Sequence, residues 1–538
     1  MNSIIIVTGV FILFILGYRF YALKIEKILD VNPQRKTPAY EKSDGVDFVP
    51  ARHWTILFGH HFSSIAGAAP IIGPIIAVSI WGWVPSVLWI VLGCIFLGGV
   101  HDFGALMCSV HHKGSTIAEI VKYILSDKAK LIFSVFVLLA LILVVAVFAF
   151  FCAKTFVADP KIVLPSLGLI PVAIFVGWLL YKVKVNQIIA TFCGLFLLFL
   201  LLILGNYFPI NLGKASLKIW MIILFIYAFF ASITPVNILL QPRDYLSSFL
   251  LLTGLFLGYL GLLITHPEMK LPSFINQKII SFNTEANPLW PMLMVTIACG
   301  AISGFHSLIA SGTTSKQLPN ERYAKRIGYG AMLLEGALAV LALVCVCGAF
   351  KSLSNLKEVL AHKGGPIQAF GIGFQNLVPF LGKFGSLIAV TVLNAFILTT
   401  LDTATRISRY ITEELTGIKN HIISTLIVII PALWLSWGGK WKLIWPTFGA
   451  SNQLVASLVL IIISCWLLSK NKCINYTLIP GILMLITTIM ALIRQTIIYI
   501  KNQNYLLLTI SVCMLILALY IPLSAFKIII RRKRQLNF

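Results

Sequence analysis

The chain has 538 residues, of which 59% are hydrophobic and only 11% charged, and its mean hydropathy is +0.94. Soluble domains are much less apolar, so this composition excludes a soluble globular protein and predicts an integral membrane protein. The formal net charge of +24 would also fit a nucleic-acid-binding protein. However, the basic residues concentrate between the apolar runs, where they set topology and attract anionic lipid, so we expect membrane lipid and no nucleic acid as a partner.

Apolar runs long enough to cross a bilayer recur along the whole chain. About fifteen transmembrane helices are expected, near residues 2–22, 55–80, 85–108, 131–153, 165–181, 187–204, 218–240, 247–265, 289–312, 329–350, 384–403, 421–437, 452–468, 476–493 and 505–526. The first run lacks a small-residue cleavage site, so it is expected to remain as a helix. If spans alternate from an outer amino terminus, the inner loops hold about two thirds of the 42 Lys and Arg residues, which predicts an inner carboxyl terminus.

The second run contains helix-breaking residues in GHHFSSIAGAAPIIGPIIAV, residues 59–78. Pro70 cannot donate a hydrogen bond to the carbonyl of Ala66, and Gly67 lowers the cost of non-helical torsions. Backbone groups freed in this way are tolerated in hydrocarbon only where protein or a polar cavity satisfies them. We therefore predict that this span breaks near mid-membrane. The site residues expected there are Ser64, Ala66, Gly67, Ala68 and Pro70.

Ionisable side chains lie at similar membrane depth in this span and in the next one. His60 and His61 lie about two turns from the predicted inner end of their helix, and His101 and Asp102 lie about two turns from the inner end of theirs. The two pairs could therefore meet across an antiparallel helix hairpin. Either a proton relay or a buried hydrogen-bonded network fits this arrangement. The histidines lack a metal-ligand spacing, so no metal site is expected.

A second interruption is predicted in FFASITPVNILLQPRDY, residues 229–245. Pro235 should free the carbonyl of Ala231. The side chains of Ser232, Thr234 and Asn237 add polar groups and are candidate substrate ligands. By alternation, this span runs opposite to the first interrupted one. Paired interrupted helices of opposite direction indicate a transporter binding site.

A third polar segment is ACGAISGFHSLIASGTTSKQL, residues 298–318. Ser303 and His306 are further substrate-ligand candidates. The hydroxyls of Ser311, Thr313 and Thr314 would suit a hard cation such as sodium, while helix packing is the alternative role for such residues.

Two more carboxylates fall within predicted spans. Glu335 could carry a proton or pair with Lys325 or Arg326. Asp402 precedes Arg406 by four residues, which is the spacing of an ordinary helix salt bridge at the membrane surface.

Six segments resemble, in the same order, signature segments of the carbon starvation protein A family. They are GHHFSSIAGAAPIIGP, GGVHDF, ACGAISGFHSLIASGTTSKQL, IGYGAMLLEGA, LTTLDTATR and WPTFGASNQLVASLVL, and they extend from about Arg52 to Leu468. The resemblance implies a transporter of the bacterial inner membrane that takes up peptides in some members and pyruvate with protons in others. No cofactor is implied.

The resemblance also implies an all-α fold whose core is two inverted five-helix repeats like those of the leucine transporter, followed by extra C-terminal helices. Residues 55–80, 218–240 and 289–312 would be core helices one, six and eight. Residues 1–54 would form an N-terminal helix and a basic inner connection, residues 55–403 the transport core, and residues 404–538 the C-terminal helices and basic tail.

The function expected from these observations is secondary active uptake of pyruvate or small peptides during carbon starvation. The N–H groups at the helix breaks would bind the substrate carboxylate, and a proton or sodium ion would supply the driving force. No G-x-x-x-x-G-K-[ST] motif occurs in the sequence, so ATP hydrolysis is not expected, and we expect no enzyme activity. The alternative is a membrane nutrient sensor that binds the ligand without transporting it.

Overall fold

The structure is a computed structural model that describes residues 1–45, 47–213, 216–235, 238–276, 278–281, 286–362, 364–437 and 441–536. Within this part of the chain all regular elements are helices and no β-strand occurs. Apolar segments fold this way because a helix satisfies its own backbone hydrogen bonds where lipid offers none. Among the described residues, twelve helices are long and apolar enough to cross a membrane, or up to 13 spans if a bent helix pair is counted as one.

The described part of the first half of the chain contains thirteen α-helices. They are α1 (Ser3–Leu16), α2 (Ala22–Ile28), α3 (Pro38–Glu41), α4 (Trp54–Ile65), α5 (Ala69–Trp81), α6 (Trp83–Gly93), α7 (Gly99–His111), α8 (Ile117–Ile124), α9 (Asp127–Ala158), α10 (Val163–Tyr181), α11 (Gln187–Tyr207), α12 (Ser216–Ile233) and α13 (Leu240–Thr265). π-Helical turns continue α1 into α2 and α6 into α7, so each of these pairs forms one long apolar span.

The second half contains ten α-helices. They are α14 (Leu289–Thr296), α15 (Gly304–Ile309), α16 (Ala331–Ala349), α17 (Leu353–His362), α18 (Gly365–Leu377), α19 (Phe384–Thr416), α20 (His421–Trp437), α21 (Trp441–Ser469), α22 (Asn475–Lys501) and α23 (Tyr505–Leu536). A π-helical turn, Ala310–Thr314, extends α15.

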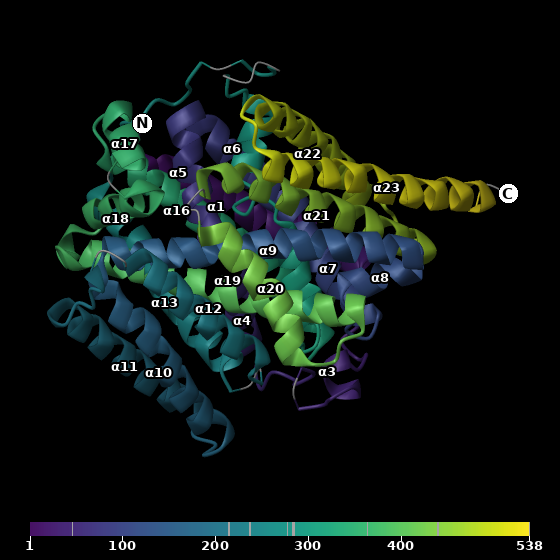
Figure 1. The fold of residues 1–538 in the computed structure, drawn as a ribbon, viewed down its shortest axis with the longest axis horizontal. Coiled ribbons are helices and arrows are strands. Elements are labelled where there is room, and N and C mark those ends of the chain that lie inside the picture. Colours follow the sequence, from purple (N-terminus) through teal and green to yellow (C-terminus); the bar gives the residue numbers. More distant parts are fainter. Residues whose placement is uncertain are drawn as a thin grey trace.

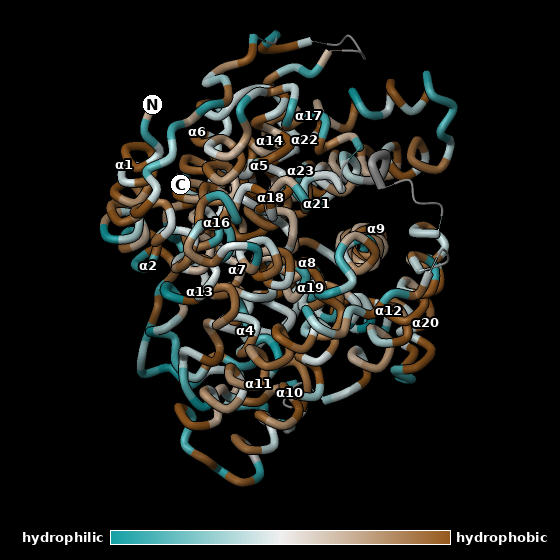
Figure 2. The backbone as a smooth tube through the Cα atoms, turned by 90° about the vertical axis from the view of Figure 1, so that its left-hand side faces the viewer, coloured by the Kyte–Doolittle hydropathy of each residue, from teal (hydrophilic) through white to brown (hydrophobic). Residues whose placement is uncertain are grey.

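The helices form a bundle in which α9 and α19, of 32 and 33 residues, pack against each other. The α10–α11 hairpin lies at one edge, and α21, α22 and α23 run side by side at another (Figure 1). Hydrophobic residues cover the outer helices as well as the interior (Figure 2), as expected for a protein whose surrounding solvent is lipid.

The connection between the first span and α4 lies across the ends of several helices on one side of the bundle. Thr37 donates a hydrogen bond of 2.6 Å to the carbonyl of Leu318, and the N–H of Ala51 donates one of 3.0 Å to the carbonyl of Gln317. Tyr410, near the end of α19, donates one of 2.5 Å to Asp47. This connection therefore leads directly into α4 while being held by the second half of the chain.

The predicted interruption of residues 218–240 is wrong. α12 is a complete 18-residue span that ends at Ile233, and Pro235 follows it before α13 begins. A proline shortly after a helix end stops the helix rather than breaking it in mid-membrane. Asn237 lies outside the described residues.

The second interruption lies instead between α14 and α15, at residues 297–303. Gly300 lies within it, and a Cβ there would approach that of Ala339 to 3.0 Å. This break was not predicted, because no proline marks it in the sequence. Small residues such as Gly300 only allow neighbouring helices to approach closely.

Candidate functional site

The predicted break in residues 55–80 is confirmed, because α4 ends at Ile65, α5 starts at Ala69, and the two helices are bent by 41°. The N–H of Gly67 closes the turn with a 2.8 Å bond to the carbonyl of Ile65. Pro70 occupies the first turn of α5, where the missing N–H costs no hydrogen bond. No side chain caps α5, and the N–H of Ala68 donates to no group among the described residues.

Two side chains from other helices face this uncapped helix end. A Cβ on Gly67 would lie 2.8 Å from Thr400 Oγ1 of α19 and 3.4 Å from Phe148 Cζ of α9. The hydroxyl of Thr400 is buried and has no hydrogen-bond partner in the described structure, and the same is true of Thr403 and Ser64. A buried unpaired hydroxyl is costly and calls for an explanation. Thr400 thus places an unpaired hydroxyl beside a helix end that no side chain caps.

The other interruption is closed by a residue of a third helix. Asn452 of α21 accepts a 2.8 Å hydrogen bond from the N–H of Phe305 at the start of α15, and its amide donates one of 3.0 Å to Ser303. The next residue, Gln453, donates one of 2.6 Å to the carbonyl of Met294 in α14. Neither residue was predicted to have a role. An Asn-Gln pair inside an apolar run is the signal that could have identified them.

A buried network joins α7, α15 and α16. His306 lies 2.8 Å from Asp102, whose other oxygen lies 2.7 Å from His101. The second ring nitrogen of His306 lies 3.2 Å from Glu335, and all four side chains have no exposed area. Neither oxygen of Glu335 accepts a hydrogen bond in the described structure. Glu335 therefore faces His306, whose other ring nitrogen is already paired with Asp102.

The predicted pairing of Glu335 with Lys325 or Arg326 is wrong. Lys325 forms its ion pair with Glu26 instead. Glu335 is fully buried in α16, and its side chain faces His306 rather than the helical turns that carry these two cations.

A second network surrounds α4. His60 lies 2.8 Å from Asp244 of α13 and 3.3 Å from the hydroxyl of Thr313, and His61 lies 2.8 Å from that of Thr314. Arg243 lies 3.0 Å from the second oxygen of Asp244. Both histidines, the aspartate and the arginine are buried.

The same network continues into α19 and α12. Arg243 forms an ion pair with Asp402, and Tyr227 donates a 2.5 Å hydrogen bond to Asp402. The predicted surface salt bridge between Asp402 and Arg406 is therefore wrong, because Asp402 points to Arg243 while Arg406 donates to the carbonyl of Ala231 at 2.7 Å. Arg243 and Asp244 were not predicted as site residues, because their helix was expected to start several residues later than it does.

The expected meeting of the pair His60–His61 with the pair His101–Asp102 does not occur as predicted. The α15 segment packs against both α4 and α7 and supplies the partners, His306 for one network and Thr313 and Thr314 for the other. Each pair thus contacts this third helix rather than the other pair.

Three other predicted residues lie apart from the α4–α5 break. Ser232 lies 3.3 Å from Thr425 of α20, and Thr234 donates a 2.7 Å bond to the carbonyl of Phe230 within its own turn. Ser311 accepts a 3.2 Å bond from the N–H of Ile117 and so ties α15 to α8. These contacts are ordinary helix packing.

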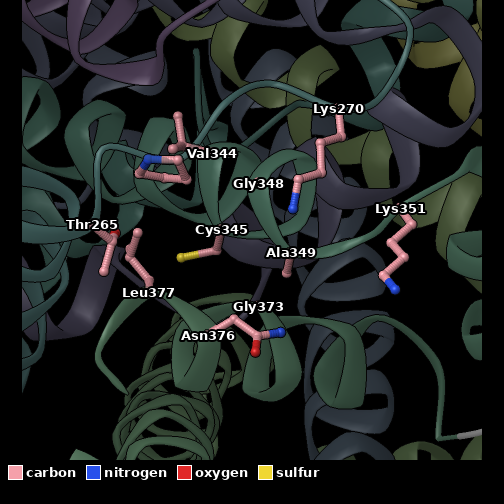
Figure 3. A pocket seen from close by; sticks show the side chains of 11 residues that line it. Thr265, Lys270, Val344, Cys345, Gly348, Ala349, Lys351, Gly373, Asn376 and Leu377 are labelled. Atoms are coloured by element: carbon pink, nitrogen blue, oxygen red, sulfur yellow. The ribbon is translucent and has the colours of Figure 1, made fainter. Parts of the chain in front are cut away.

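Two cavities flank the bundle interior. A cavity of about 300 Å³, which we call the α14 cavity, reaches the end of α14 next to the second interruption. It is lined by Ile76, Ile80, Trp81, Asn287, Met292, Thr296, Leu360, Pro366, Trp445 and Pro446. Another, of about 430 Å³, lies where α13, α16 and α18 end (Figure 3). Its Lys270 and Lys351 complement the negative ends of those helices, and none of the predicted site residues lines it. Among the described residues, no group of three His, Cys, Asp or Glu is arranged to hold a metal ion.

Comparison with known proteins gives a consistent picture. The family model described as "Carbon starvation protein CstA" matches residues 2–357 and 349–491. The peptide transporter CstA of Campylobacter jejuni is 30% identical over 94% of this chain and 82% of its own length, and the pyruvate/proton symporter BtsT of Escherichia coli K12 is 30% identical over 89% and 80%. A manganese transporter of Eremococcus coleocola has a similar fold, with a TM-score of 0.54 at 14% identity over 91% of this chain and 99% of that one.

Proposed function

The chain belongs to the carbon starvation CstA family, and from this premise we propose that it is a secondary active transporter that imports pyruvate or short peptides together with protons. Its membrane-spanning helices and its transporter relatives imply a multi-pass protein of the inner membrane. The names of the relatives give no support to the alternative of a nutrient sensor, and they fit a protein that is not an enzyme. The observation that carries the proposal is the uncapped end of α5, buried beside an unpaired hydroxyl.

The architecture proposed for this transporter is an inverted repeat. The bent pair α4–α5, the interrupted pair α14–α15 and the 17-residue α20 would add three crossings to the twelve long helices and give about fifteen. One repeat would start at α4 and the other at α14, each with an interrupted helix. Each repeat would contain one very long helix, α9 or α19. In the first repeat α13 packs against α4, and in the second α21 packs against α15.

This arrangement changes the assignments implied by the resemblance. Core helix six becomes α14–α15 instead of residues 218–240, and core helix eight becomes α19 instead of residues 289–312. The transport core then extends from Trp54 to about Ser469 rather than ending at residue 403. α1, the α10–α11 hairpin, α22 and α23 are additions around it. The amino terminus outside and the carboxyl terminus inside follow from the charge distribution.

The substrate carboxylate would bind at the start of α5. The N–H of Ala68 and the positive end of the helix dipole attract an anion, and the hydroxyl of Thr400 adds a hydrogen-bond donor. Gly67 leaves room for the carboxylate, since any side chain there would meet Thr400. Ser303 and His306 would act as framework, because Asn452 and Asp102 already engage them.

Proton coupling is supported by the charges buried in the two networks. Asp102, Asp244, Glu335 and Asp402 are four buried carboxylates. Arg243 pairs with two of them, and Arg406 contacts carbonyls, so neutral histidines would leave excess negative charge in the membrane interior. Uncompensated charge is expensive there, and uptake of protons removes it. His306 and Glu335 are the proposed proton carriers, with His101 and Asp102 orienting them.

Sodium would use a different set of groups. The carbonyl of Ala66 and the unpaired hydroxyls of Thr400 and Thr403, three residues apart on α19, are oxygen ligands of the kind a hard cation takes. Thr313 and Thr314 are engaged by His60 and His61 and are therefore poorer candidates than the sequence suggested.

Alternating access would follow from movement of the two halves against each other. On the inner side, α4 is held against α13 by His60 and by a 2.8 Å hydrogen bond from Ser63 to the carbonyl of Asp244. On the outer side, the α14 cavity reaches toward the second interruption. In the proposed topology, these contacts would close the path to the inside.

The test is uptake of labelled pyruvate and of labelled dialanine into vesicles that contain the full chain, under an imposed proton gradient or an imposed sodium gradient. Uphill accumulation driven by protons and abolished by an uncoupler is the expected result. Accumulation driven by sodium alone would mean that sodium, and not the proton, is the coupled ion. Binding without uptake under every gradient would refute transport.

A further inference from the structure

Four aromatic side chains fill the space between the α14 cavity and the α4–α5 break. Phe148 and Phe151 belong to α9, and Trp445 and Phe448 belong to α21. All are buried, with exposures between 1% and 8%. Because Trp445 also lines the α14 cavity, one end of this ring cluster borders open space.

The rings form a continuous series of contacts, two of them edge-to-face and one tilted. Trp445 lies 5.7 Å from Phe151 at 88° and 5.4 Å from Phe448 at 58°, measured between ring centroids. Phe448 lies 6.0 Å from Phe148 at 82°. Such contacts add stability beyond the apolar area that they bury. The cluster therefore holds α9 and α21 together beside the cavity.

The other end of the series lies at the helix break. The Cζ atom of Phe148 would be 3.4 Å from a Cβ on Gly67, which is ordinary van der Waals contact. Thr400, with its unpaired hydroxyl, borders the same glycine. The ring series therefore extends from Trp445, which lines the α14 cavity, to Phe148, which borders the helix break.

We propose that Phe148 and Phe448, supported by Phe151 and Trp445, form an aromatic gate over the carboxylate site and set the upper size limit of the transported molecule. This inference rests on the proposed function and adds its specificity-determining residues. Rotation of one phenylalanine ring about its side-chain bonds opens a passage of about one ring in width. A small 2-oxo acid fits such a passage, whereas a bulkier carboxylate requires both rings and the tryptophan to move.

The test compares single variants in vesicles that contain the full chain. Labelled pyruvate is taken up under the gradient that drives the wild type, and unlabelled competitors are added in order of increasing size: 2-oxobutyrate, 2-oxo-4-methylpentanoate, dialanine and trialanine. The variants are Phe148→Ala and Phe448→Ala. Phe148→Leu and Phe448→Leu remove the ring but keep a buried apolar side chain, in case the alanine variants fail to insert.

Phe156→Ala is the matched control. Phe156 lies on the same helix, α9, and is equally buried, but its ring contacts Trp220, 5.0 Å away, and does not line the α14 cavity. Its removal should leave the size profile unchanged.

In the wild type, competition is expected to weaken steeply as the competitor grows. The gate variants should lower the half-inhibitory concentration of the larger competitors, relative to that of pyruvate, by about tenfold or more. An apolar site usually discriminates by about this factor between molecules that differ by one or two carbon groups. An unchanged size profile in inserted, active gate variants would overturn the gate while leaving the transport proposal intact. A wild-type profile that is flat across the series would also overturn it. If the wild type takes up no carboxylate under any gradient, the proposed function itself fails, and the gate with it.

Discussion

The two interrupted helices differ in what their broken ends contact. At the α14–α15 interruption, Asn452 caps the start of α15 and bonds to Ser303, so the break is closed by the protein itself. At the α4–α5 interruption, the N–H of Ala68 has no partner in the described structure and Thr400 offers an unused hydroxyl. One break is therefore closed by the protein itself, whereas the other is the proposed binding position, although both interrupt an apolar helical segment.

The histidines on the two interrupted helices differ in a similar way. The acid partner of His60, Asp244, also pairs with Arg243, so this network contains its own counter-charge. His306 faces Asp102 and Glu335 without a buried arginine or lysine among its contacts in the described structure. The first network is therefore balanced by an arginine, whereas the second contains the proposed proton carriers. Five changes test this contrast.

The largest effect is expected from Arg243→Ala. It leaves Asp244 and Asp402 as buried carboxylates without their cation, which should cost about 3–5 kcal/mol of unfolding free energy. Thermal unfolding in detergent, together with the amount of protein in the membrane, measures this loss. The double variant Arg243→Ala/Asp402→Asn should recover part of it. Equal stability of the single variant and the wild type would show that the pairing of Arg243 with the two carboxylates contributes no net stability.

Gly67→Ala should abolish most uptake and leave the fold intact. The added methyl group would lie 2.8 Å from Thr400 Oγ1 in the open break, and displacing a binding position by about 1 Å can cost about 100-fold in rate. Initial uptake rates give the result. The control is Gly254→Ala, because the nearest atom to a Cβ there is 3.5 Å away. Normal uptake by Gly67→Ala would remove the binding role from this break.

Glu335→Gln should uncouple uptake from the gradient. The amide keeps the shape of the side chain but cannot exchange a proton, so the accumulation ratio should fall to about one while substrate exchange continues. Glu268→Gln, at an exposed loop carboxylate, is the control. Full proton-driven accumulation by Glu335→Gln would assign the proton to the other network.

Asn452→Ala should weaken the α14–α15 joint. It leaves the N–H of Phe305 and the hydroxyl of Ser303 without their partner, at a cost of about 1–3 kcal/mol. We expect a lower unfolding temperature with an unchanged KM for substrate. A raised KM without loss of stability would mean that this break also binds substrate.

Thr400→Val should have the smallest and most specific effect. The two side chains have nearly the same shape, so stability should stay within the error of measurement, while loss of one hydrogen bond to the carboxylate should raise KM by about threefold to tenfold. Concentration-dependent uptake measures KM. An unchanged KM would place the carboxylate elsewhere.

The sequence predicted the features that leave a local signal. Pro70 and Gly67 identified the break between α4 and α5, and the long apolar runs identified most of the helices. Pro235 gave the same local signal, but it lies after the end of α12, and only the length of that helix in three dimensions distinguishes a stop from a break. The α14–α15 break depends on Asn452, about 150 residues later, and no local pattern reveals such a cap.

The partners of the buried acids were beyond prediction for a related reason. Asp402 and Arg406 have the spacing of a helix ion pair, yet each bonds to a group on another helix. A buried charge without a partner is very costly, so its contacts depend on which groups the other helices bring near it. His60 and His101 were expected to lie on helices that meet, but the helix segment that contacts both networks comes from the other half of the chain.

The connection that precedes α4 has a consequence for how the protein is made. Thr37 and Asp47 bond to residues that follow them by 281 and 363 positions. While the ribosome is still synthesising the second half, these contacts do not exist, and α4 lacks the tether that fixes its entry point. The entry point of α4 is therefore fixed only after α19 has been made, and a chain truncated before α19 would lack the bond between Tyr410 and Asp47.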